Sequence, residues 1–215
     1  MKPLFKALLW IALTFGAIIG VLRVTVINFW TIPADDPLLS ASLAPTLDGG
    51  DVVVVWTQGH PGFGDVTRCR DPESPERWVI GRVFGEAGDK VTIDGASVSV
   101  NNKRTFSPHG CDKILVNDPT SGAPVELFCD IVELGGTTFQ RARAQGDKTR
   151  SRAGGRSAHD VAQGQLFLVS DNMYFHSDSR DYGALDIPSC PDHIVFRLWS
   201  AKGWSDSTRR LSVIR

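Results

Sequence analysis

Residues 40–56, SASLAPTLDGGDVVVVW, place a segment with two serines directly before a run of β-branched residues. The four consecutive valines at 52–55 favour extended backbone, because branching at Cβ restricts the side chain and suits a pleated surface. The run is apolar, and its length suits one buried strand. The stretch therefore predicts a core strand with a hydroxyl-bearing segment immediately before it.

The rest of the chain repeats short apolar segments separated by turns rich in glycine. Further strand candidates lie at residues 78–84, 90–93, 165–170 and 194–200. With 21 glycines and 12 prolines the chain has few helix-forming runs, so the predicted fold class is mainly β. We expect one domain at residues 31–215, with an inserted β extension and loop at about 101–163, where the pattern weakens.

The N-terminus carries a long apolar segment. Residues 7–22 form a run of 16 without a charge, and apolar character resumes after Arg23. About 20 apolar residues cross the ~30 Å hydrocarbon core of a bilayer, and a basic side chain near the end can extend to the lipid interface. No small-residue cleavage signal follows, which favours an uncleaved transmembrane helix over a removed secretory signal.

The charges around this segment predict its orientation. Lys2 and Lys6 precede it, and basic residues are enriched on the cytoplasmic side of membrane spans. We therefore expect residues 1–30 to form a cytoplasmic N-terminus and a single-pass anchor. The domain that follows would then work on the extracytoplasmic face, in contact with membrane lipid.

Four cysteines fit an oxidising compartment, where disulfides persist. They are Cys69, Cys111, Cys129 and Cys190. Four cysteines allow three pairings, among which the sequence does not choose firmly. Cys111 and Cys129 flank one hairpin-like stretch and are the first choice, with free buried thiols as the alternative.

The charge balance excludes one class of partner. A net charge of −1 lacks the basic excess that nucleic-acid binding normally requires, so no nucleic-acid partner is expected. Residues 141–157 do carry six basic residues and one acid. This segment predicts a mobile surface loop, with contact to anionic lipid headgroups as the less favoured alternative.

The motif S-x-S-L-x-P-T-L at residues 40–47, followed by the valine-rich strand, resembles the nucleophile box S-M-x-P-T-L of bacterial type I signal peptidases. Three further boxes of that family have counterparts in the same order. They are Gly64-Asp65-Val66, residues 79–91 (VIGRVFGEAGDKV) and residues 170–183 (SDNMYFHSDSRDYG). The resemblance covers about residues 4–100 and 163–200. It implies an antiparallel β peptidase domain behind one transmembrane helix, in the bacterial inner membrane.

The resemblance also implies roles for individual residues. That family cleaves secretory preproteins after Ala-x-Ala with a serine nucleophile and a lysine base, so signal peptides are the implied partners. Matched by position, Ser42 is the nucleophile, and the Ser42 amide and Ser40 hydroxyl stabilise the oxyanion. No metal or organic cofactor is expected. The pockets for small side chains, for which core packing is the alternative, fall on Leu43, Val53, Val79 and Ile80.

The chain departs from the family where the base should be. The lysine position falls on Gly81, and the neighbouring Arg82 cannot replace it because guanidinium stays protonated in proteins. Lys90, the nearest lysine, lies beyond a turn and matches another family position. About six extra residues, 34–39, also precede the serine box, which predicts an altered approach to the cleft.

His176 offers a replacement base, because it occupies the place of a family serine that hydrogen-bonds the lysine. Histidine titrates at about 6.5 and lysine at about 10.4 in unstructured peptides, so histidine needs less tuning to act as a base. We predict that Gly81 leaves room for the ring and that Asp178 or Asp171 orients it. The alternative is a polar surface histidine. Asp178 and Arg180 match a structural ion pair of the family, whose expected role is support.

The sequence thus predicts a membrane-bound, signal-peptidase-like serine endopeptidase that removes signal peptides from secreted preproteins. Two alternatives stay open. One is a catalytically inactive relative that binds preproteins, and the other is a maturation peptidase dedicated to one exported partner. The altered segment 34–39 favours narrowed specificity of this last kind.

Overall fold

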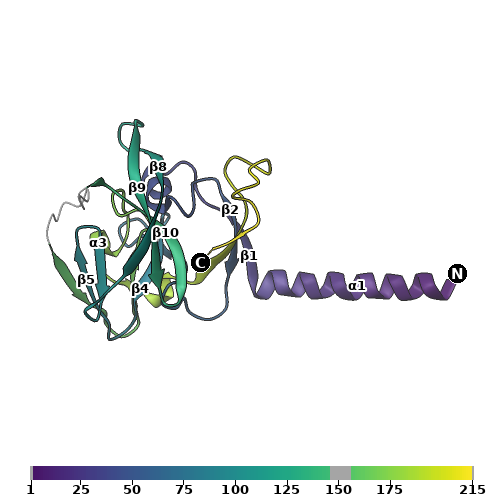
Figure 1. Cartoon of the computed structure of the whole chain (residues 1–215). Coiled ribbons are helices and arrows are strands. Elements are labelled where there is room, and N and C mark those ends of the chain that lie inside the picture. Colours follow the sequence, from purple (N-terminus) through teal and green to yellow (C-terminus); the bar gives the residue numbers. More distant parts are fainter. Residues whose placement is uncertain (1, 146–155, 215) are drawn as a thin grey trace.

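The computed structural model describes residues 2–145 and 156–214. Its largest sheet contains the valine-rich strand, in which Val53 and Val55 are buried. Figure 1 shows this sheet, whose strands follow the order β1-β2-β14-β3-β4-β12-β13, with β15 paired to β14. These strands are β1 (Ile27–Thr31), β2 (Val52–Trp56), β3 (Val66–Arg70), β4 (Trp78–Gly85), β12 (Gln165–Val169), β13 (Leu185–Asp186), β14 (Asp192–Trp199) and β15 (Ser212–Val213).

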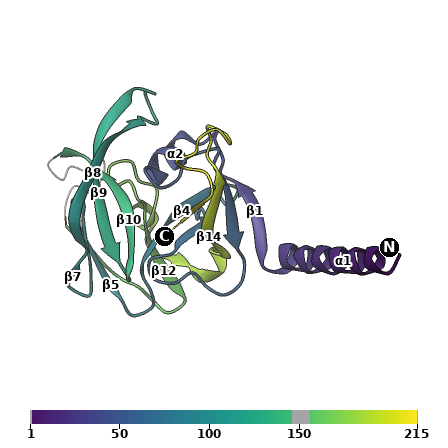
Figure 2. The same cartoon turned by 45° about the vertical axis from the view of Figure 1, so that its right-hand side comes forward.

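Of two smaller sheets (Figure 2), one lies within the predicted insertion and the other combines two strands from it with two that precede it. Their strand orders are β10-β9-β8 and β11-β5-β6-β7. All the strand pairings in the three sheets are antiparallel, which confirms the mainly β class. The strands are β5 (Lys90–Asp94), β6 (Ser97–Val100), β7 (Lys103–Arg104), β8 (Phe106–Asn117), β9 (Pro124–Leu134), β10 (Thr137–Arg143) and β11 (Ser157–Asp160).

The predicted surface loop at residues 141–157 is only partly a loop. Residues 141–143 end β10, and residue 157 begins β11. Most of the predicted loop, residues 146–155, lies outside the described residues.

Helix α2 (Pro37–Leu43) carries both serines, in a stretch for which the sequence analysis predicted no helix. Asp36 caps it, because its carboxylate accepts the Leu39 amide at 3.0 Å. Pro37 suits the first turn, where its missing N–H leaves no helical bond unmade. Asp36 also pairs with Arg77 at 2.8 Å. The other short helices are α3 (Ser179–Tyr182) and the 3-10 helix η2 (Ile187–Ser189).

Helix α2 is packed on both sides. Leu39 and Leu43 pack on the largest sheet in one core cluster, which includes Ile80. Ala41 belongs to another cluster, with Val116 of the β8–β9 hairpin. The helix that carries the two serines is therefore held between the large sheet and the inserted three-stranded sheet.

The structure joins the four cysteines in two disulfides. Cys111 and Cys129 face each other directly across β8 and β9, which confirms the first choice from the sequence. Cys69 of β3 bonds Cys190, which follows η2. This second bond links segments 121 residues apart in the chain.

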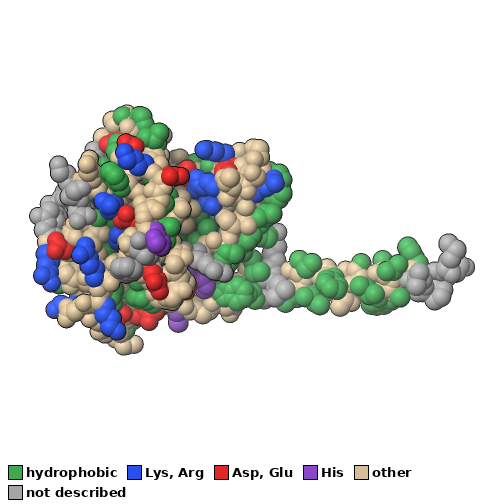
Figure 3. Space-filling view, in the orientation of Figure 1, with side chains coloured by type: hydrophobic (Ala, Val, Ile, Leu, Met, Phe, Trp, Pro, Cys, Tyr) green, Lys and Arg blue, Asp and Glu red, His purple; other side chains and the backbone are tan. Residues whose placement is uncertain are grey.

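Helix α1 (Lys2–Thr25) extends away from the sheets, with exposed apolar side chains from Phe5 to Val21 (Figure 3). The sequence predicted a membrane-spanning helix at this position. The helix is present, but among residues 2–145 and 156–214 no helix is long and apolar enough to cross a membrane. The predicted span is therefore not supported.

Candidate active site

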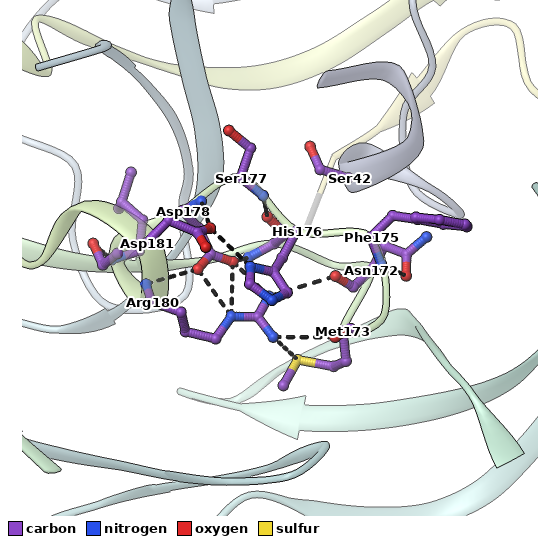
Figure 4. Close-up of polar contacts among 12 residues, drawn as sticks. Ser42, Asn172, Met173, Phe175, His176, Ser177, Asp178, Arg180 and Asp181 are labelled. Carbon is purple, nitrogen blue, oxygen red and sulfur yellow. Dashed lines mark hydrogen bonds and ion pairs between the residues drawn. The ribbon is translucent and has the colours of Figure 1, made fainter. Parts of the chain in front are cut away.

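Ser42 lies in the last turn of α2 with its side chain in the interior. The residue is 0% exposed, and its hydroxyl donates to the Leu39 carbonyl at 2.8 Å. Helical serines commonly make such a bond to a carbonyl of the preceding turn. The hydroxyl is thus closed off from a peptide in this structure, and no hydrogen bond joins it to the described His176 (Figure 4).

Ser40 is turned into the loop that follows the helix. Its hydroxyl donates to Asp48 Oδ1 at 2.7 Å and accepts the Gly49 amide at 2.7 Å. A Cβ at position 49 would lie 2.5 Å from the Ser40 oxygen, so this close approach requires glycine. The predicted role of Ser40 as an oxyanion donor requires its hydroxyl to leave Asp48.

The four residues predicted to line substrate pockets are packed in the core. Leu43 is 4% exposed, and Val53, Val79 and Ile80 are each 0% exposed. Three of them share the cluster under α2, whereas Val79 packs with Cys69 in a different cluster. Since consecutive strand residues point to opposite faces, Val79 and Ile80 do not line one pocket. Core packing, the alternative interpretation, describes all four.

Gly81 does not leave an empty space. A Cβ at this position would lie 3.2 Å from Leu168 Cβ and 3.2 Å from the Val169 carbonyl oxygen. β12 approaches β4 this closely next to a register shift between Phe167 and Leu168. The prediction that Gly81 leaves room for an imidazole is therefore not supported, because β12 already fills that space.

His176 is oriented by Asp181. Its Nδ1 lies 2.8 Å from Asp181 Oδ2, and its side chain is 5% exposed. The other ring nitrogen, Nε2, is buried without a hydrogen-bond partner among the described residues. The sequence had indicated Asp178 or Asp171 for this contact, so the prediction is corrected to Asp181. An imidazole with one nitrogen fixed by a carboxylate and the other unpaired is arranged as a general base.

Asp178 is committed to Arg180 and not to the imidazole. Arg180 donates to it from Nη2 at 2.6 Å and from Nε at 2.9 Å, and the Ser170 amide donates at 2.6 Å. Burial raises the pKa of Asp178, but Arg180, His176 and the Ser170 amide outweigh that effect and lower it to about 2. The carboxylate therefore stays ionised and paired with Arg180.

Asp171 forms a second buried ion pair. Arg82 donates to it from Nε at 3.0 Å and from Nη2 at 2.9 Å. The Thr46 hydroxyl also donates to Asp171, at 2.5 Å. Asp171 thus ties β4 to the segment that follows Ser42.

Asn172 joins the Ser42 backbone to the loop that carries His176. Its amide N–H donates to the Ser42 carbonyl at 3.1 Å, and its side chain donates to the Ala41 carbonyl at 2.8 Å. The side-chain oxygen accepts the amides of Tyr174 and Phe175. One residue therefore fixes the end of α2 and shapes the turn before His176.

The histidine and two carboxylates also lie close enough to be considered as metal ligands. Ligand atoms of His176, Asp178 and Asp181 lie within 4.8 Å of one another. The set fits a metal poorly, because the Arg180 guanidinium already holds Asp178 at 2.6 Å. A cation would have to displace that buried arginine.

Sequence reasoning missed Asp181 and Asn172. Asp181 had a local signal, because it stands three residues after Asp178 and completes a capping box at the start of α3. Asn172 lies in the box at residues 170–183, but its role was missed because its bonds to Ala41 and Ser42 join residues far apart in the chain.

Comparison with known proteins agrees with the order of the boxes. Residues 6–199 match the family model described as signal peptidase, peptidase S26. The chain is also similar to the mitochondrial ATP-independent inner membrane protease subunit 1a of Arabidopsis thaliana, with 23% identity over 164 residues. That match covers 74% of this chain and 66% of the relative, so the chain spans just under two thirds of the relative's length. Because the family model covers most of the sequence, this chain belongs to the signal peptidase S26 family.

Proposed function

We propose that this chain is a serine endopeptidase that acts on exported preproteins, with Ser42 as nucleophile and His176, oriented by Asp181, as base. The state of the His176 ring carries the proposal. One nitrogen lies 2.8 Å from a carboxylate oxygen, and the other is buried and unpaired among the described residues. Leaving a buried polar atom unpaired costs about 1–3 kcal/mol, and such atoms in native structures are often functional.

Catalysis requires the 0% exposed Ser42 to become accessible to the substrate and its hydroxyl to be freed for reaction. Its hydroxyl must release the Leu39 carbonyl, and rotation about χ1 moves it between staggered positions without moving the backbone. His176 Nε2 then accepts the hydroxyl proton as Oγ attacks the peptide carbonyl carbon. The imidazolium returns the proton to the leaving amine, and water hydrolyses the resulting ester by the same route. The bond between Asn172 and Ser42 supports this pairing, because it holds the nucleophile's backbone beside the histidine loop.

The proposal also places the activity at a membrane, on its extracytoplasmic side. Two disulfides support an extracytoplasmic compartment. The exposed apolar side chains of α1 and the membrane named for the plant relative support work at a membrane. The bacterial type and the cleavage after Ala-x-Ala rest on the resemblance of the four boxes.

A preprotein-binding relative without activity is the second candidate function. It is favoured by the burial of Ser42 and by the bond of its hydroxyl to Leu39. The cavity between α2 and the end of β8 would then hold a signal peptide that is never cut. The capped helix at 37–43 supports a variant of the first proposal. In this variant the chain is a maturation peptidase dedicated to one exported partner.

The test is cleavage of a preprotein with an Ala-x-Ala site by the full chain in detergent. We expect Ser42→Ala, His176→Gln and Asp181→Asn to lower the rate, the first two by at least about 100-fold. Asparagine at 181 keeps an oxygen for the capping box and loses only the charge. His193→Gln is the matched control, because His193 also has a buried ring nitrogen without a partner among the described residues.

The outcomes separate the candidates. Cleavage that needs Ser42 and His176 but not His193 supports the proposed pair. Cleavage that survives His176→Gln contradicts it. Binding of the preprotein without cleavage, in wild type and variants alike, supports the inactive relative.

A further inference from the structure

Both serine hydroxyls of α2 are occupied by bonds to residues close by in the chain. Ser42 donates to the Leu39 carbonyl at 2.8 Å, and Figure 4 shows its hydroxyl turned away from the His176 ring. Ser40 donates to Asp48 Oδ1 at 2.7 Å. Ser42 is also 0% exposed. The helix therefore keeps the nucleophile closed off from a substrate.

Leu39 links the closure of Ser42 to the start of the helix. Its carbonyl accepts the Ser42 hydroxyl, while its amide donates to the Asp36 carboxylate at 3.0 Å. If the first turn unwinds, the Leu39 carbonyl moves and the Ser42 hydroxyl loses its acceptor. Leu39 is 2% exposed, and its burial makes the closed helix the more populated state. The reactivity of Ser42 thus depends on the first turn of α2.

Arg77 holds this first turn from outside the helix. It lies directly before β4 and donates to Asp36 Oδ2 from Nη2 at 2.8 Å and from Nε at 3.2 Å. The Arg77 side chain is 48% exposed, so water and salt weaken the pair. A helix of seven residues is marginal by itself and depends on such contacts. The start of α2 is therefore held by a bond that can be exchanged.

The other end of α2 is fixed to the loop that carries His176. The Asn172 amide donates to the Ser42 carbonyl at 3.1 Å, and the Asn172 side chain donates to the Ala41 carbonyl at 2.8 Å. Asn172 is 0% exposed, so these bonds are shielded from water. When the first turn opens, the Ser42 backbone stays beside the histidine loop. Opening thus frees the hydroxyl without moving the nucleophile away from its proposed base.

The first turn also has space beside it. A cavity of about 510 Å³ borders the turn and the start of β4. Its lining includes Asp36, Pro37 and Leu39 of the turn together with Arg77 and Trp78. The turn can therefore shift toward this space without displacing a strand of the sheet.

We propose that the first turn of α2 is an autoinhibitory latch, closed by the Asp36 cap and the Asp36–Arg77 pair, whose release exposes Ser42 for reaction. The inference rests on the proposed function, because the latch regulates Ser42 only if Ser42 is the nucleophile. It assigns a regulatory role to Asp36 and Arg77, which take no part in the proposed chemistry. Any group that competes with Arg77 for Asp36, salt included, shifts the chain toward the open state.

The test measures the rate at which a serine-directed phosphonate labels Ser42 in the full chain in detergent. Asp36→Ala removes both the cap and the ion pair, and we expect labelling to become about fivefold faster. Arg77→Gln removes only the pair, and we expect a rise of about twofold. Damage to the fold would lower the labelling rate, whereas release of the latch raises it.

Two neighbouring residues provide matched controls. Asp35→Ala removes an exposed carboxylate next to the cap, and Arg70→Gln removes an exposed arginine that contacts the Trp78 ring. Both variants should be labelled at the wild-type rate. Added salt should speed the labelling of wild type by up to about twofold and leave Arg77→Gln nearly unchanged, because the pair that salt screens is already gone.

Labelling of both release variants at the wild-type rate would overturn the latch and leave Ser42 as the nucleophile. An equal acceleration in the two controls would overturn it as well. If hydrogen exchange at residues 37–43 quickens in Asp36→Ala while labelling does not, the helix opens without exposing the serine, and the latch is again refuted. Absence of Ser42 labelling in wild type and in both release variants would contradict the proposed function itself, and the latch with it.

Discussion

Two segments meet at Ser42, and their buried polar groups are partnered in opposite ways. In the loop at 170–183, Asp171 and Asp178 each accept two bonds from one arginine. In the segment at 34–49, the hydroxyls of Ser40 and Ser42 bond only to neighbours in the same short segment. The two loop carboxylates are held by buried arginines, one from β4 and one from the loop itself, whereas the two serine hydroxyls bond only within their own segment.

This contrast separates the buried ion pairs, which hold the fold, from the groups that are proposed to react. Two buried ion pairs, Asp178–Arg180 and Asp171–Arg82, stand behind the loop; only the first has a counterpart in the family resemblance. The groups proposed to react are Ser42 and the His176–Asp181 pair, and glycine stands at the position that the resemblance assigns to the lysine.

Breaking the Asp178–Arg180 ion pair should have the largest effect on the free energy of unfolding. Asp178→Ala leaves Arg180 buried and unpaired, so we expect it to lower the free energy of unfolding by about 3–5 kcal/mol. Chemical denaturation measures this loss. Glu126→Ala is the control, because it breaks the exposed Lys113–Glu126 pair and should cost less than about 1 kcal/mol. Equal losses in the two variants would contradict the structural role of the Asp178–Arg180 pair.

Acid should lower the stability that Asp178 contributes in the loop at 170–183. The pKa of Asp178 is about 2 in the folded protein, below the ordinary aspartate value of 3.8 that applies to the unfolded chain. Because the folded value is the lower one, its stabilisation is complete above about pH 4 and is lost as the pH falls toward 2. The loss is about 2 kcal/mol and is measurable by denaturation across that range. Asp178→Asn should lack this part of the pH dependence, and an unchanged acid limb in that variant would count against the assignment.

Restoring a side chain at position 81 should have a smaller effect. The added methyl of Gly81→Ala must push against Leu168 and Val169, so we expect a loss of about 1–2 kcal/mol in the free energy of unfolding. Gly110→Ala is the control, because the nearest atom to its Cβ is 3.6 Å away, at ordinary contact distance. Gly81→Lys should likewise lose stability without raising cleavage. A lysine there that raised the rate would show that the family's base site is still open.

Removing the cap of α2 should have the smallest effect on stability. Asp36→Ala loses the bond to the Leu39 amide and the contact with Arg77, at about 1 kcal/mol. Hydrogen exchange at residues 37–43 should become faster, because the turn that holds the Ser42 hydroxyl is loosened. Asp35→Ala, next to the cap, should leave exchange in α2 unchanged. Equal exchange rates in both variants would refute the cap as the group that closes the serine segment.

Local signals predicted the strands well and the serine helix poorly. The valine run at 52–55 became a strand because its β-branched side chains suit a pleated, buried surface. Cys111 and Cys129 were the first choice because they flank a hairpin-like stretch, and they lie opposite each other across β8 and β9. Helix α2 was missed even though Asp36 and Pro37 form a start signal for a helix, because the short run after them is also consistent with a loop.

The sequence predicted individual residues of the site but not the contacts between them. His176 was found from its position in a box, but its partner depends on the turn that Asn172 shapes. The closed space at Gly81 depends on a register shift in β12, which no pattern near residue 81 indicates. The first point depends on a local turn, whereas the second depends on contact between strands far apart in the chain.

The proposed Ser42–His176 pair is tested most simply by the rate at which a serine-directed phosphonate labels Ser42 in the full chain. We predict that wild type and His193→Gln are labelled at similar rates. We also predict that His176→Gln is labelled at least about 100-fold more slowly, because the base is gone. Equal labelling of wild type and His176→Gln, with Ser42→Ala unlabelled, would show that Ser42 reacts without the histidine and would contradict the proposed pair.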